Sequence, residues 1–80
     1  MYASKIDIAV LLIFFNRDAQ FAQVFEQVKK ARPSRLYLYQ DGARENRPDD
    51  VAGIARCRAI AEDIDWECEV HRLYQEKNFG

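Results

Sequence analysis

Glycine is scarce in this 80-residue sequence, which contains only three. None lies between the apolar run that ends at Phe15 and the helical pattern that follows it. The GxGxxG fingerprint of dinucleotide-binding folds and the P-loop both need glycines at such a point, because the backbone there approaches phosphates closely. The sequence therefore excludes both of these ways to bind a nucleotide.

Cysteine is rare as well, with Cys57 and Cys68 as the two examples. Two cysteines make no disulfide framework, their spacing matches no zinc pattern, and one histidine cannot complete a metal site. We predict two small buried apolar residues.

Neither excess charge nor a membrane-length apolar run is present. The formal net charge of −1 provides no field for nucleic acid or for an anionic membrane. The longest apolar run, Ile8 to Phe15, is too short to cross a bilayer, which needs ~20 residues. The segment Met1 to Ser4 lacks the basic start of a signal peptide. We therefore expect no nucleic-acid partner, no transmembrane segment and, by default, a cytoplasmic location.

Three strand-like runs alternate with two helical patterns along the chain. Strands are expected at Ile6–Phe15, Arg35–Gln40 and Trp66–Leu73. The first helix is expected from a cap at Asp18 to about Arg32, with an apolar stripe of Phe21, Val24, Phe25 and Val28. The second helix is expected from Pro48 onward, with Asp49 and Asp50 at its positive end and Arg58 on its solvated side. In the third run, Trp66, Cys68 and Val70 alternate with polar residues, which is typical of a half-exposed strand. Apolar and polar residues do not alternate in the first run, which is typical of a strand buried on both faces of a parallel sheet. The pattern predicts an α/β fold, a three-layer Rossmann-like open parallel sheet built as βαβαβ.

Polar residues follow the first two strands at the points where each ends. Arg17, in Asn16-Arg17-Asp18, is either an anion partner for a diphosphate or a solvated residue beside a helix cap, and the sequence leaves both open. Asp41, before Gly42, is either an acceptor for a ribose hydroxyl or a base N–H, or part of an Asx-turn. The position at a strand end favours the functional reading of Asp41.

The other polar residues give weaker indications of function. Asp63 and Asp65 look like a metal-binding pair, but they lie between the second helix and the third strand, at the opposite rim. His71 stands alone on an expected edge strand, and Trp66 is more typical of a core. No Ser-His-Asp or Cys-His grouping is evident.

Three short motifs occur in order: Phe14-Phe15-Asn16-Arg17, Gln40-Asp41-Gly42 and Glu76-Lys77-Asn78-Phe79-Gly80. In this combination the chain resembles the start of a nucleotide-diphospho-sugar glycosyltransferase. It is most similar to family-2-like bacterial members with the GT-A fold, including those described as hemolysin-related. The resemblance extends over nearly all of the chain, and the order of the motifs carries it.

The resemblance implies a sheet order of 3-2-1, with a fourth strand to follow beside the first. It implies that Asp41 meets the uracil or ribose of a donor such as a UDP-sugar. The nucleotide-binding set it implies also contains Phe15, Asn16 and Arg17 in the first loop, and Lys77, Asn78 and Gly80 closing over the base.

The family transfers a sugar from its nucleotide-diphosphate donor to an acceptor hydroxyl. A divalent cation, Mn²⁺ or Mg²⁺, stabilises the departing diphosphate as a Lewis acid. The family's metal-binding acids and catalytic base come after the position of Gly80. Residues 1–80 are therefore expected to be a single partial domain, the nucleotide-binding half of a longer enzyme, with no catalytic or metal-binding residue of its own and inactive alone.

Two alternatives belong to other classes. The chain could be a stand-alone α/β binding module resembling half of a response-regulator receiver, or a protein-interaction module without catalysis. A receiver has an acidic cluster at its strand ends, whereas Asp41 stands alone. Since a sheet lacking its fourth strand would leave an apolar first strand at the edge, we also expect a homo-oligomer formed through that edge.

Overall fold

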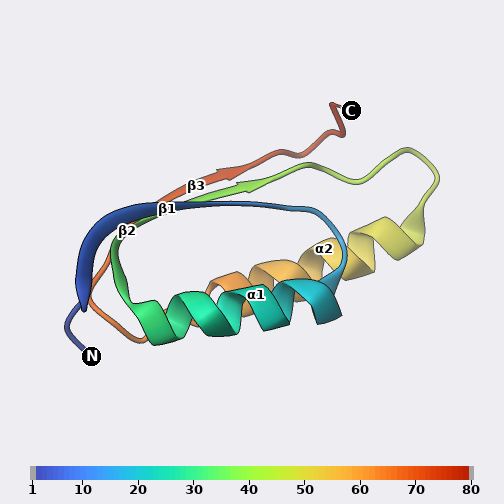
Figure 1. Cartoon of the computed structure of the whole chain (residues 1–80). Coiled ribbons are helices and arrows are strands. Elements are labelled where there is room, and N and C mark those ends of the chain that lie inside the picture. The colour runs from blue at the N-terminus through green and yellow to red at the C-terminus, as the bar shows by residue number, and fades with distance from the viewer. Residues whose placement is uncertain (1, 80) are drawn as a thin grey trace.

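The computed structural model describes residues 2–79, and Gly80 lies outside them. The chain forms β1 (Ile6–Phe14), α1 (Asp18–Ala31), β2 (Pro33–Gln40), α2 (Pro48–Ala61) and β3 (Glu69–Tyr74). β1 pairs with β2 and β2 with β3, both in parallel, so that β2 is central (Figure 1). The predicted α/β class, parallel sheet and strand order are confirmed.

Both helices lie on the same face of the sheet (Figure 1). Three layers were expected, and residues 2–79 form two of them: the sheet and one helical layer. The opposite face is uncovered, and Leu11, Ile13 and Leu73 are 61%, 72% and 56% exposed. In register, Ile13 lies beside Tyr39 and Tyr39 beside Leu73, so apolar side chains run across this face.

The core lies between the sheet and the helices. Phe21, Phe25 and Val28 of the predicted α1 stripe are buried, whereas Val24 is half-exposed. The Phe21 ring stacks on Phe14 with centroids 4.1 Å apart. Burying a phenylalanine side chain contributes about 1.5–3 kcal/mol, so these contacts hold α1 on the sheet. The other core residues are Leu36, Leu38, Cys57, Ala61 and Trp66.

Two local predictions are wrong. β1 was expected to be buried on both faces, but among its residues only Phe14 is buried, because β1 is an edge strand with one covered face. Asp18 was expected to cap α1, but Arg17 occupies the cap position without a side-chain hydrogen bond. Asp18 is the first helical residue, and its carboxylate lies 3.3 Å from the Arg56 guanidinium while still facing the positive end of the helix dipole.

The third strand also begins later than expected. Trp66 and Tyr2 form an isolated parallel bridge, and β3 starts at Glu69. The Trp66 ring is buried and its Nε1 donates to the Pro33 carbonyl at 2.9 Å, which fixes the segment between α2 and β3 against the start of β2. No helix within residues 2–79 is long and apolar enough to span a membrane.

Candidate functional site

The carboxyl ends of β1 and β2 meet at one rim of the sheet because the strands are parallel and Phe14 pairs with Gln40. The loop after β1, the loop after β2 and the tail after β3 come together there (Figure 1). Every predicted nucleotide-binding residue within the described range is in one of these three segments: Phe15, Asn16, Arg17, Asp41, Lys77 and Asn78. Predicted Gly80 lies outside the described residues.

A cleft of about 650 Å³ opens at this rim. Phe15, Asp41 and Asn78 line it, as the sequence predicted, whereas Asn16, Arg17 and Lys77 do not. The sequence did not point to Tyr39 or Arg44, which also line it. Ile13 and Phe14 complete the lining, so the cleft combines three aromatic residues, a carboxylate, an amide and a guanidinium.

The Asp41 carboxylate fastens the tail to the end of β2. Its Oδ1 accepts hydrogen bonds from the backbone N–H of Gly42 at 2.9 Å and of Phe79 at 3.0 Å. The Asn78 amide donates to the Gly42 carbonyl at 3.0 Å. Among residues 2–79, nothing donates a hydrogen bond to Asp41 Oδ2. One oxygen therefore holds the loop, and the other is available as an acceptor at the cleft.

Asp50, in the first turn of α2, is fully buried and joins both rim loops. Asn16 Nδ2 donates to its Oδ1 at 2.8 Å. Arg44 donates to the same carboxylate from its backbone N, Nε and Nη2, at 3.1, 2.8 and 2.8 Å. These charge-assisted bonds, first those of the Arg44 side chain, hold the pKa of the Asp50 carboxyl well below its usual range. The sequence indicated only a carboxylate at a positive helix end.

Gln40 makes a second buried junction behind the cleft. It is fully buried, and its Nε2 donates to the carbonyls of Phe15 at 2.7 Å and Ile54 at 3.3 Å. Its Oε1 accepts from Arg58 Nε at 2.6 Å. Arg58 was expected on the solvated side of the second helix, but it turns toward Gln40. A glutamine at the end of an otherwise apolar inward-facing row is a signal the sequence does contain.

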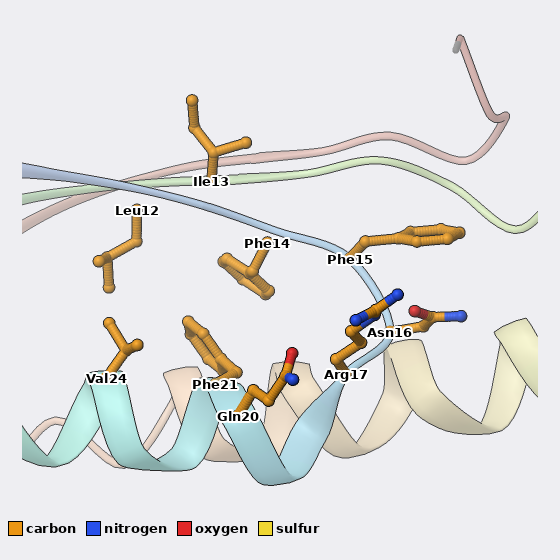
Figure 2. Close-up of a pocket in the computed structure, with 9 residues that line it drawn as sticks. All are labelled: Leu12, Ile13, Phe14, Phe15, Asn16, Arg17, Gln20, Phe21 and Val24. Carbon is orange, nitrogen blue, oxygen red and sulfur yellow. The ribbon is translucent and has the colours of Figure 1, made fainter.

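Arg17 and Asn16 do not face the Asp41 cleft. Asn16 is bound by Asp50, and Arg17 lines a separate cavity of about 290 Å³ between β1 and α1 (Figure 2). In the described part of the chain the Arg17 guanidinium has no hydrogen-bond or ion-pair partner. The guanidinium at the Asp41 cleft belongs to Arg44, whose Cζ lies 5.6 Å from the centroid of the Phe15 ring. A role for Arg17 in binding a diphosphate stays a prediction.

The acids at the opposite rim make structural contacts. Asp63 forms an ion pair with Lys29 at 2.6 Å, which ties the end of α2 to α1.

His71 stacks on Tyr37 on the uncovered face of the sheet, and its Nε2 lies 2.9 Å from Glu69. Glu69 thus has a partner that the sequence did not indicate.

A divalent cation does not fit the residues described. Over residues 2–79, no three His, Cys, Asp or Glu side chains gather closely enough to hold a metal ion. At the rim, Asp50 is committed to Arg44, and one oxygen of Asp41 is committed to two backbone amides. A lone remaining carboxylate oxygen is too small a ligand set for Mg²⁺ or Mn²⁺.

Comparison with known proteins gives no relative: no family model, no curated protein and no solved structure matches this chain.

The Asp50 contacts predict how stability depends on pH. Because the folded-state pKa of Asp50 lies below the unfolded value of about 3.9, its contribution is present above about pH 4 and is lost as the pH falls. Glu62, whose pKa is lowered by Arg72, acts in the same direction. We expect the free energy of unfolding, measured by urea titration, to fall between about pH 4 and 2. The Asp50→Asn chain should show a shallower fall than Asp49→Asn, and equal slopes would contradict this role of Asp50.

Proposed function

We propose that this chain is the nucleotide-binding portion of a cytoplasmic glycosyltransferase that takes its sugar from a nucleotide-diphosphate donor such as a UDP-sugar. The observation that carries the proposal is the Asp41 carboxylate at the end of β2, with one oxygen held by backbone amides and the other available at a cleft. In open α/β sheets ligands bind outside the carboxyl ends of the strands, which is where this cleft lies.

The cleft residues supply complementary chemistry for a nucleoside. Asp41 Oδ2 would accept from a uracil N–H or a ribose hydroxyl, and the faces of Phe15 and Tyr39 are suited to stack on a base. Asn78 and Lys77 belong to the tail that would close over the base, and the resemblance adds Gly80. Arg44 shares its charge with Asp50, so it would contribute hydrogen-bond donors more than net positive charge.

In this proposal the described residues bind and orient the donor nucleotide, and other parts of the enzyme carry out the sugar transfer. In the whole enzyme, an acceptor hydroxyl would displace the diphosphate at the anomeric carbon. A Mn²⁺ or Mg²⁺ ion would stabilise the leaving diphosphate, held by acids outside this chain. The catalytic base, and the residues that bind the acceptor and the donor sugar, would likewise belong to other parts of the enzyme.

Titration of the ¹⁵N-labelled chain with UDP, followed by NMR, tests the proposal. We expect saturable shifts in the amide signals of Gly42, Arg44 and Phe79, which surround Asp41. Asp41→Asn should weaken binding about tenfold or more, because the amide keeps one oxygen for the tail but presents an N–H₂ where the ligand donates. CDP, whose base lacks the N3–H, should bind more weakly than UDP.

The matched control is Asp65→Asn, which removes the same charge from an exposed position at the opposite rim. It should bind UDP like the unchanged chain. The absence of shifts at the rim with UDP at millimolar concentration would overturn the proposal, and so would equal affinity in Asp41→Asn.

A protein-interaction module without catalysis is the second candidate. The uncovered sheet face favours it, because the exposed side chains of Leu11, Ile13 and Leu73 make that face apolar instead of polar and solvated. A thermal-shift screen across nucleoside diphosphates distinguishes the two candidates. A flat response supports the interaction module, whereas stabilisation by UDP supports nucleotide binding.

A further inference from the structure

The Arg44 guanidinium at the cleft is held in one orientation by a buried carboxylate. Its Nε and Nη2 donate to the two oxygens of Asp50, both at 2.8 Å, and Asp50 is fully buried in the first turn of α2. A bidentate pair of this kind fixes the plane of the guanidinium. The same two bonds leave the third nitrogen, Nη1, outside the pair, on a half-exposed side chain that lines the cleft.

The pairing with Asp50 decides which group of a nucleotide suits Nη1. Because the Asp50 carboxylate neutralises the cation, Arg44 attracts a diphosphate only weakly, whereas its N–H groups remain good directional donors to a neutral carbonyl. The Phe15 ring, whose centroid lies 5.6 Å from Arg44 Cζ, also lines the cleft and is suited to stack on a base. Nη1 is therefore placed to read a base more than to bind phosphate.

The acceptor in the same cleft is the second oxygen of Asp41, since Oδ1 is held by the backbone N–H groups of Gly42 and Phe79. Resting on the proposed binding of a nucleotide-diphosphate donor, we propose that Arg44 determines the specificity for the base. Asp41 Oδ2 accepts from N3–H of uracil, and Arg44 donates to one of the two carbonyls beside N3.

The hydrogen-bonding edge of uracil fits an acceptor and a donor placed side by side. N3–H lies in the middle of that edge with a carbonyl on each side, so Arg44 meets an acceptor on whichever side of Asp41 it lies. Cytosine and adenine have an unprotonated nitrogen in the middle, and guanine has an N–H₂ group on one side. The pair of Asp41 and Arg44 therefore selects the uracil ring.

Sulfur analogues of the two carbonyls test the contact in the unchanged chain. Isothermal titration calorimetry with UDP, 2-thio-UDP and 4-thio-UDP, below neutral pH so that N3 keeps its proton, measures the three affinities. Sulfur is a weaker acceptor than oxygen, so the analogue changed at the carbonyl that Arg44 contacts should bind about threefold to tenfold more weakly than UDP.

Arg44→Lys tests whether Arg44 makes this contact. Lysine keeps a cation for Asp50, but its single ammonium group cannot pair with Asp50 and also present a fixed second donor to the base. This chain should bind UDP about threefold to tenfold more weakly and should bind UDP and both analogues alike. The matched control is Arg47→Lys, because Arg47 belongs to the same loop, pairs with exposed Asp49 and is not among the residues lining the cleft. It should keep the preference for UDP.

Two results would overturn the role of Arg44 and leave the proposed function intact, provided that UDP binding still depends on Asp41. The first is a preference for UDP over the analogues that is the same in Arg44→Lys as in the unchanged chain. The second is equal binding of UDP and both analogues by the unchanged chain, a result that does not depend on whether Arg44→Lys folds. Absence of any UDP binding by the unchanged chain would instead overturn the proposed function, and the role of Arg44 with it.

Discussion

Asp50→Asn is expected to lower the melting temperature by roughly 10 °C and to loosen both loops at the cleft. Four donors from Asn16 and Arg44 converge on two carboxylate oxygens of a fully buried side chain. An amide offers one oxygen and turns an N–H₂ group toward donors, so buried hydrogen bonds are lost without replacement. The Arg44 side chain is 44% exposed and can be rehydrated, which limits the loss.

Asp49→Asn is the control for this substitution. Asp49 is the neighbouring residue in the first turn of α2, carries the same charge and is 66% exposed on its side chain. Its replacement removes a surface ion pair with Arg47 and should leave the melting temperature within about 2 °C of the unchanged chain. Differential scanning calorimetry of the three chains measures the effect. Equal melting temperatures for all three would show that the Asp50 contacts do not stabilise the fold.

Gly53→Ala should be destabilising by about 2 kcal/mol, although alanine is the better helix former. An added Cβ at this position would lie 2.4 Å from the backbone oxygen of Asn16 and 2.9 Å from its Cβ. The first contact involves main chain that cannot rotate away, so α2 and the loop after β1 must separate. Separation would also lengthen the Asn16–Asp50 hydrogen bond, which joins the same two segments.

Urea unfolding at neutral pH measures the cost of Gly53→Ala, with Ala52→Gly as its control. Ala52 is the exposed neighbour on the same helix, and its replacement reports helix propensity alone, a loss of about 1 kcal/mol. If Gly53→Ala proved more stable than the unchanged chain, propensity would dominate and the contact between α2 and the β1 loop would be looser than described.

The element pattern could be predicted from the sequence because it depends on local periodicity. The stripe from Phe21 to Val28 indicated α1, and the alternation after Trp66 indicated a strand with one exposed face. Parallel pairing then followed from the order of strands and helices, since a helical crossover returns the chain in the same direction. Which residues share a rim, including Phe15 and Asp41, followed from that pairing alone.

Burial could not be predicted in the same way. β1 reads as a fully buried strand, but its exposure depends on what lies next to it, and in residues 2–79 nothing covers its outer face or its free edge. Asp50 reads as a surface carboxylate at a helix start, but it is buried because Asn16 and Arg44 reach it from two loops. Nothing in the spacing or the residue type of Asn16 or Arg44 indicates, in the sequence, that these residues contact Asp50.

By itself, the sequence determined the α/β class and the placement of Asp41 at a strand end, because hydrophobic periodicity and strand–helix alternation are local and directional properties. The strand order was an expectation from the resemblance. Only the tertiary structure decided which guanidinium lies at the Asp41 cleft, that Asn16 is bound to Asp50, and that both helices cover one face. Those outcomes depend on contacts between segments far apart in the chain, where hydrogen-bond geometry and the exclusion of water select one partner among several of the same chemical type.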